Sequence, residues 1–163
     1  MRNLFFLFFL FTLMGCASKE AKKAPEVVFN TIDGKVIKIT DYKGKKIVLN
    51  FWSVNCSACI REIPEIVDFY NENKEKVGVI SVVILSSKKD VEDLIKKYKI
   101  NFPICLGDEK IADLFGGIIF LPTTFIIDED GYIRLKINGA IGKVELEKIL
   151  KSLDYNEKAK KTE

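Results

Sequence analysis

Two cysteines separated by two residues, Cys56 and Cys59, stand where a strand-like segment gives way to a helix-like one. The apolar run from Ile47 to Trp52 is typical of a central strand covered on both faces. From Ser57 to about Asn73, apolar residues recur at helical spacing. The pair therefore opens a helix, where unpaired N–H groups and the helix dipole favour a thiolate. We expect Cys56 to be the exposed nucleophile and Cys59, one turn inside, to be the resolving thiol.

The rest of the chain alternates strand and helix patterns, which predicts an α/β fold with a mixed central sheet flanked by helices. A small N-terminal hairpin is expected over residues 27–39, because Asp-Gly stands between two short apolar runs. The other predicted elements are strands over 77–85, 123–127 and 132–137, and helices over 88–98, 109–115 and 144–153.

The sequence gives less support to other roles for the cysteine pair. The chain has no histidine, which excludes a Ser-His-Asp triad, a Cys-His protease pair and c-type haem attachment at this motif. A zinc site would need a second pair, and Cys105 is the only other cysteine apart from the N-terminal Cys16. A purely structural disulfide would close too short a loop to stabilise the fold strongly. We therefore expect redox chemistry with no metal and no further cofactor. The net charge of +3 is too small to indicate nucleic-acid binding.

The first residues have the pattern of an export signal. The apolar run from Leu4 to Met14 follows a positive charge and is too short to span a bilayer, which takes about 20 residues. It ends at Gly15-Cys16, which resembles the lipobox of bacterial lipoproteins, whose cysteine carries the lipid. An ordinary secretory signal, or a buried apolar start in which Cys16 is incidental, is the alternative.

These patterns divide the chain into four expected segments. They are a lipoprotein signal peptide over 1–15, the lipidated Cys16 with a polar tether over 16–24, a globular domain over 25–153, and a polar tail over 154–163. We expect the tail to be disordered, because it offers little apolar surface to bury. The expected location is a bacterial membrane surface facing the periplasm or the cell exterior, where disulfides persist.

Several motifs at matching separations carry a family resemblance. They are Val48-Leu49-Asn50-Phe51-Trp52-Ser53, the Cys56–Cys59 motif, Glu62-Ile63-Pro64, Phe102-Pro103, Leu121-Pro122-Thr123-Thr124-Phe125, Gly131 and Gly139-Ala140. Together they resemble the thioredoxin-like, membrane-anchored reductases of the TlpA/ResA group. The resemblance implies a thioredoxin-like fold and thiol–disulfide oxidoreduction of extracytoplasmic proteins, often in cytochrome c maturation, with electrons from a membrane donor.

The resemblance also implies roles for individual residues. Pro122 matches the proline whose preceding peptide bond is cis and which faces the cysteine pair; without the resemblance, an ordinary trans proline opening a strand is favoured. A cis bond would place the Leu121 backbone where a substrate segment can pair as an added strand. Glu62 matches a carboxylate able to relay a proton to the resolving sulfur, and an exposed acid in the first helical turn is the equal alternative. The residues expected to contact substrate are Trp52, Asn55, Leu121 and Thr123.

Departures from the family pattern leave the reduction potential open. Asn55 replaces a common tryptophan before the first cysteine, and Ser57-Ala58 lacks the common proline. Asn50 stands where thioredoxins carry a buried aspartate, so Glu62 is the remaining proton acceptor. Cys105 is expected to pack as a small buried hydrophobe.

The sequence therefore favours a lipid-anchored thiol–disulfide oxidoreductase that reduces partner proteins. A peroxiredoxin-like peroxidase is the alternative enzyme, although its proline position, counted back from Cys59, is Trp52. A non-enzymatic Cu(I)-carrying lipoprotein is the third possibility; the lack of histidine and of methionine outside the leader counts against it.

Overall fold

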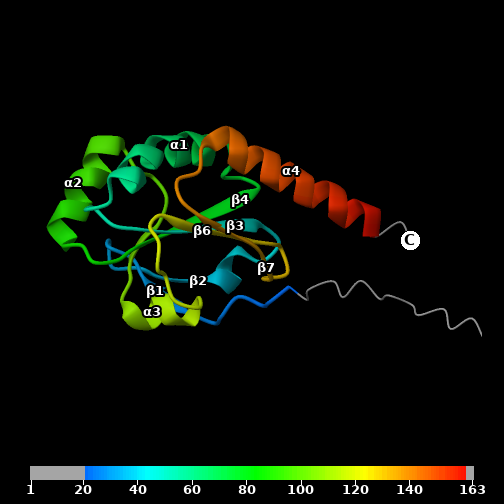
Figure 1. Cartoon of the computed structure of the whole chain (residues 1–163), viewed down its shortest axis with the longest axis horizontal. Coiled ribbons are helices and arrows are strands. Elements are labelled where there is room, and N and C mark those ends of the chain that lie inside the picture. Colours follow the sequence, from blue (N-terminus) through cyan, green and yellow to red (C-terminus); the bar gives the residue numbers. More distant parts are fainter. Residues whose placement is uncertain (1–20, 161–163) are drawn as a thin grey trace, which may run out of the picture.

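A computed structural model describes residues 21–160, so the expected signal peptide over 1–15 and the expected lipidation site Cys16 lie outside the described residues. A five-stranded mixed sheet in the order β5-β4-β3-β6-β7 forms the centre of the domain (Figure 1). Its strands are β3 (Lys46–Trp52), β4 (Val77–Val83), β5 (Ile104–Leu106), β6 (Thr123–Ile127) and β7 (Ile133–Asn138). Strands β3, β4 and β5 are parallel, and β6 runs antiparallel to β3 and β7. The expected α/β class with a mixed sheet is confirmed.

Helices cover both faces of the sheet (Figure 1). Helices α1 (Ser57–Asn73), α2 (Lys88–Tyr98) and α4 (Lys143–Lys160) lie over one face. Helix α3 (Glu109–Leu114) and the antiparallel hairpin of β1 (Val28–Asn30) and β2 (Val36–Lys38) lie over the other, followed by a short 3₁₀ helix, η1 (Ile39–Tyr42). The predicted N-terminal hairpin is thus confirmed. No helix within residues 21–160 is long and apolar enough to cross a membrane.

Strand β3 lies in the middle of this sheet, and all seven of its residues are buried. Its alternate side chains enter two cores. Val48 and Trp52 pack with α1, α2 and α4, whereas Leu49 and Phe51 pack with α3 and the hairpin. Burial on both faces explains why the strand reads as a continuous apolar run. The strand ends directly before the loop that leads into Cys56, so the cysteine pair directly follows the buried central strand of the sheet.

The structure differs from the sequence-based expectation in one missed strand and in the limits of several segments. Strand β5 (Ile104–Leu106) was not predicted, because three residues are too few to show a periodic pattern. Strand β4 stops at Val83 rather than Leu85, since Leu85 has a left-handed φ of 51°. The expected tether stops before residue 22: the carbonyl of Lys22 accepts a hydrogen bond from Ile133 N–H, and Ala24 N–H donates to the Gly131 carbonyl, which adds residues 22–24 to the edge of β7.

The expectation of a disordered tail from residue 154 is wrong as far as residue 160, because α4 continues to Lys160. Apolar periodicity in the sequence stops at Leu153, where the predicted helix ended. The next residue of the helix makes an ion pair: Asp154 Oδ1 lies 2.5 Å from the Nζ of Lys46, a buried lysine at the start of β3. A contact 108 residues apart in the chain leaves no local pattern in the sequence.

Candidate active site

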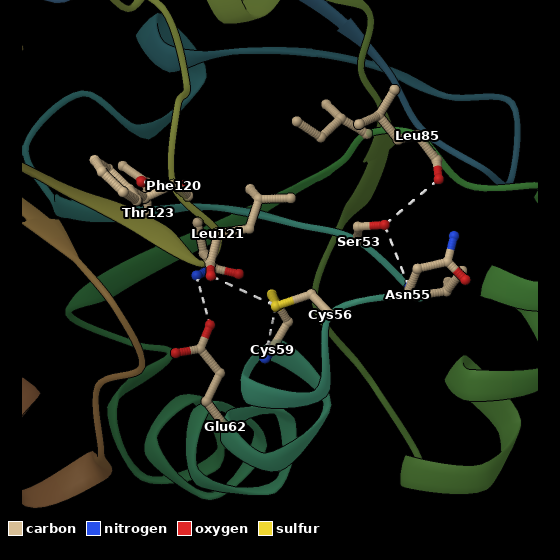
Figure 2. Close-up of a disulfide and its surroundings, with 12 residues drawn as sticks. Ser53, Asn55, Cys56, Cys59, Glu62, Leu85, Phe120, Leu121 and Thr123 are labelled. Carbon is tan, nitrogen blue, oxygen red and sulfur yellow. Dashed lines mark hydrogen bonds between the residues drawn. A yellow bond between two sulfur atoms is a disulfide. The ribbon is translucent and has the colours of Figure 1, made fainter.

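Cys56 is the N-cap residue of α1 and is joined to Cys59 by a disulfide, with their Cα atoms 5.2 Å apart (Figure 2). The backbone N–H of Cys59 donates a hydrogen bond to Cys56 Sγ at 3.2 Å. Sulfur thus occupies the position that a serine or aspartate oxygen takes in an ordinary helix cap. Cys59 is fully buried, and Cys56 is partly exposed. Only the first sulfur is therefore open to a partner, as expected from its place at the start of the helix.

The loop that leads into Cys56 is tied to the end of β4 by two serines. Ser86 Oγ accepts a hydrogen bond from Val54 N–H at 3.0 Å and donates to the Ile84 carbonyl at 2.9 Å. Ser53 Oγ lies 3.2 Å from Ser86 Oγ and donates to the Leu85 carbonyl at 3.4 Å. These bonds satisfy a loop N–H that would otherwise lack a partner, and they hold the two loops beside one another (Figure 2).

On the other side of Cys56 lies the loop before β6. The peptide bond between Leu121 and Pro122 is cis, as the family resemblance implies. The carbonyl oxygen of Leu121 lies 3.5 Å from Cys56 Sγ (Figure 2). Thr123 Oγ1 donates to the Phe120 carbonyl at 2.7 Å and so fixes the loop from within. The backbone of Leu121 is thereby placed beside the reactive sulfur.

Glu62 lies one turn after Cys59 and is buried, with 3% of its surface exposed, so the alternative of an exposed acid is excluded. Asn50 Nδ2 donates to its Oε1 at 2.9 Å, and the backbone N–H of Ile141 donates to its Oε2 at 3.0 Å. Burial raises the pKa of Glu62 to about 7, and these two donors act against that rise by stabilising the carboxylate. A group with this pKa takes up and releases protons near neutral pH.

Two of the four residues expected to contact substrate do not reach the surface. Trp52 is 1% exposed and donates its Nε1–H to Ser81 Oγ at 2.6 Å, and Thr123 is fully buried. Both side chains lie beneath the site, and the expectation that these two residues contact substrate stays a prediction. Asn55 is exposed and Leu121 is partly exposed, so these two remain available to a partner.

Some parts of the site were not predicted. Thr124 accepts a hydrogen bond from Asn50 Nδ2 at 3.0 Å, and Ile141 contributes a backbone N–H, which has no signature in sequence.

Cys105 is fully buried in the core on the α3 side of the sheet, and burial raises its pKa to about 12. Among residues 21–155, whose side chains are described, no cluster of three or more potential metal ligands occurs.

Solved structures share this fold. A thiol:disulfide interchange protein of the thioredoxin family from Chlorobium tepidum matches with a TM-score of 0.77 and 26% identity, covering 83% of this chain and 98% of that one. StoA from Bacillus subtilis matches with a TM-score of 0.67 and 30% identity, covering 77% and 96%. With a disulfide between the cysteines of a C-x-x-C motif at the start of α1, the fold and site define a thiol–disulfide oxidoreductase with a thioredoxin-like fold.

Sequence relatives give the family. The AhpC/TSA family model matches residues 21–136. The thiol-disulfide oxidoreductase ResA of Bacillus cereus is 38% identical over 153 residues, covering 88% of this chain and 87% of that protein. The thioredoxin-like protein YneN of Bacillus subtilis is 33% identical over 135 residues, covering 81% and 79%. The chain belongs to the AhpC/TSA family, among the ResA-type thiol–disulfide oxidoreductases.

Proposed function

We propose that this oxidoreductase works as a reductant of disulfides in extracytoplasmic proteins, cytochrome c precursors among them, with Cys56 as nucleophile and Cys59 as resolving thiol. The observation that carries the assignment of roles is the asymmetry of the pair. Cys56 Sγ is partly exposed, accepts the Cys59 N–H at 3.2 Å and lies beside the Leu121 carbonyl, whereas Cys59 is fully buried. A helix N-terminus stabilises the thiolate form of the first sulfur.

The reaction is a pair of thiol–disulfide exchanges. The Cys56 thiolate attacks one sulfur of the partner's disulfide, forming a mixed disulfide and releasing the partner's other sulfur as a thiolate. Cys59 then loses its proton and attacks Cys56 Sγ, which frees the partner's second thiolate and leaves the Cys56–Cys59 disulfide. The partner gains two electrons, and a dithiol donor in the membrane must return two to the enzyme.

Glu62 is the proposed acceptor of the Cys59 proton. It lies on the same face of α1, three residues further along, and is buried with a pKa near 7. A buried thiol loses its proton reluctantly, because burial disfavours the thiolate. An ionised carboxylate nearby supplies a base at the pH where the enzyme works.

The lipid anchor at Cys16 belongs to this proposal. Residue 22 is fixed at the β6–β7 turn, which pairs near the start of β3, whereas Cys56 follows the end of β3. The chain therefore enters the domain at the end of the sheet opposite the active site. Six residue steps from Cys16 to Lys22 reach at most about 20 Å. An anchored domain would lie close to the membrane with Cys56 directed away from it.

The assignment of the two sulfurs is tested by single substitutions. Reduced wild-type protein should reduce a protein disulfide, C56S should show no reaction, and C59S should stop at a stable mixed disulfide detectable by mass spectrometry. A mixed disulfide trapped on Cys59 in C56S would reverse the roles.

Rapid peroxide consumption, or stoichiometric Cu(I) retention without exchange activity, would contradict the proposed reaction. Metabolic labelling with a radioactive fatty acid, lost in C16A, tests the anchor.

A further inference from the structure

Leu85 combines two unfavourable features. It has a left-handed φ of 51°, a conformation that is unfavourable for an ordinary L-residue and that glycine or asparagine adopts more easily. Its apolar side chain is also 81% exposed. Nothing within the described fold benefits from leucine here, since the residue's backbone carbonyl, not its side chain, accepts the bond from Ser53. Residues in this conformation cluster at active sites and ligand-binding sites.

Its place in the molecule indicates the function. Among the side chains described, the two most exposed large aliphatic ones are Ile119 at 84% and Leu85 at 81%, and Phe120 follows Ile119 at 62%. Leu85 lies in the loop tied to Ser53, which leads into Cys56, and Phe120 directly precedes Leu121, whose carbonyl is beside Cys56 Sγ. Figure 2 shows Leu85 and Phe120 on opposite sides of the cysteine. The accessible sulfur therefore lies between two apolar loops.

We propose that Leu85 is a specificity-determining residue that packs against an apolar side chain next to the disulfide cysteine of a polypeptide substrate, opposite Ile119 and Phe120. The inference rests on the proposed function and deepens it. A partner's sulfur must come within bonding distance of Cys56 Sγ, and the residues beside that sulfur are then brought toward the two loops that flank Cys56. An exposed leucine there loses water only when a partner is present, and its burial then favours apolar partners.

The experiment compares reduced wild-type protein with L85N, because asparagine tolerates the left-handed conformation and has a similar size but is polar. Single-turnover rates are measured by acid quench and mass spectrometry with three oxidants. The first two are synthetic peptides, each closed by one disulfide, with either leucine or serine on both sides of each cysteine. The third is bis(2-hydroxyethyl) disulfide, which has no side chains beside its sulfurs.

We expect L85N to react about tenfold more slowly with the leucine peptide and at an unchanged rate with the serine peptide and the small disulfide. Its unfolding midpoint in urea should be equal to or above that of wild type. The variant Y155A, which truncates an exposed apolar residue one position after Asp154 at the far end of the sheet, should leave all three rates unchanged.

The outcomes distinguish a failure of the role proposed for Leu85 from a failure of the proposed exchange reaction. Equal rates of L85N and wild type on the leucine peptide, or equal slowing with all three oxidants, would overturn the role of Leu85 while leaving the exchange reaction intact. Loss of stability in L85N would assign Leu85 a structural role instead. If wild-type protein fails to react with any of the three disulfides, the proposed function itself fails.

Discussion

Asn50 and Glu62 form a buried hydrogen-bonded pair between β3 and α1, with Asn50 Nδ2 donating to Glu62 Oε1 at 2.9 Å. The asparagine cannot accept a proton from a thiol, but it holds the carboxylate that can. Asn50 Nδ2 also donates to Thr124 Oγ1, directly opposite in β6. The pair thus links the central strand, the helix that carries both cysteines and the strand that follows Pro122.

The raised pKa of Glu62 should make stability depend on pH. The pKa is 4.5 for an ordinary glutamate and about 7 in the fold, so the folded state retains a proton that the unfolded state releases between these values. The contribution of this group is fully favourable below pH 4.5 and is lost as pH rises to 7. Urea unfolding from pH 4.5 to 8 should show wild type losing on the order of 3 kcal/mol relative to E62Q.

A control separates this effect from general charge effects. E65Q changes an exposed glutamate on the same helix and should retain the wild-type pH dependence. An E62Q curve parallel to that of wild type between pH 4.5 and 7 would show that Glu62 titrates in the folded protein as it does in the unfolded chain.

Removing the Asn50 donor should raise the pKa of Glu62 further, because a hydrogen bond to the carboxylate favours its charged form. In N50L, which has similar volume, the pH at which the resolving step accelerates should move upward from about 7 by roughly one unit or more. The measurement is the rate at which a preformed mixed disulfide on Cys56 is resolved, followed from pH 5 to 9. An unchanged inflection in N50L, or an inflection that persists in E62Q, would remove Glu62 from the proton transfer.

Cys105 should be chemically silent in the folded protein. It is fully buried and its pKa is raised to about 12 by burial, so almost no thiolate exists at neutral pH. Iodoacetamide at pH 7.5 should alkylate Cys56 in the reduced native protein and modify Cys105 only in denaturant, as peptide mapping would show. The variant C105A should keep wild-type exchange rates, and a slower C105A of unchanged stability would give this thiol a redox role.

Ser86 should stabilise the loop that presents Cys56. The variant S86A leaves the Val54 N–H without its partner and should lower the free energy of unfolding by about 1 kcal/mol. Native-state amide exchange should show Val54 losing protection more than strand β3. S152A, which removes an exposed hydroxyl on α4, should change stability by less than about 0.5 kcal/mol. Unaltered protection at Val54 in S86A would mean that this bond does not hold the loop.

Local patterns in the sequence were sufficient to predict the elements that carry the reactive cysteines. The predicted limits of the helices over 57–73 and 88–98 agree with α1 and α2, since apolar periodicity and capping residues act within a few residues of one another. The Cys-x-x-Cys spacing likewise fixes both sulfurs within one helical turn. The predicted disulfide chemistry depended on that spacing and on the helix start, both of which are local.

Tertiary structure decided what depends on residues far apart in the chain. The sequence left open whether Glu62 is an exposed acid or a buried base. In the fold, Asn50 and the backbone N–H of Ile141 donate hydrogen bonds to its buried carboxylate. Trp52 and Thr123 were expected to contact substrate, and both are buried because neighbouring strands and helices cover them. The strained, exposed conformation of Leu85 has no sequence signal, since leucine is not a residue that favours positive φ. Burial and pKa are set by what packs around a side chain, and that packing exists only once the sheet and its helices have assembled.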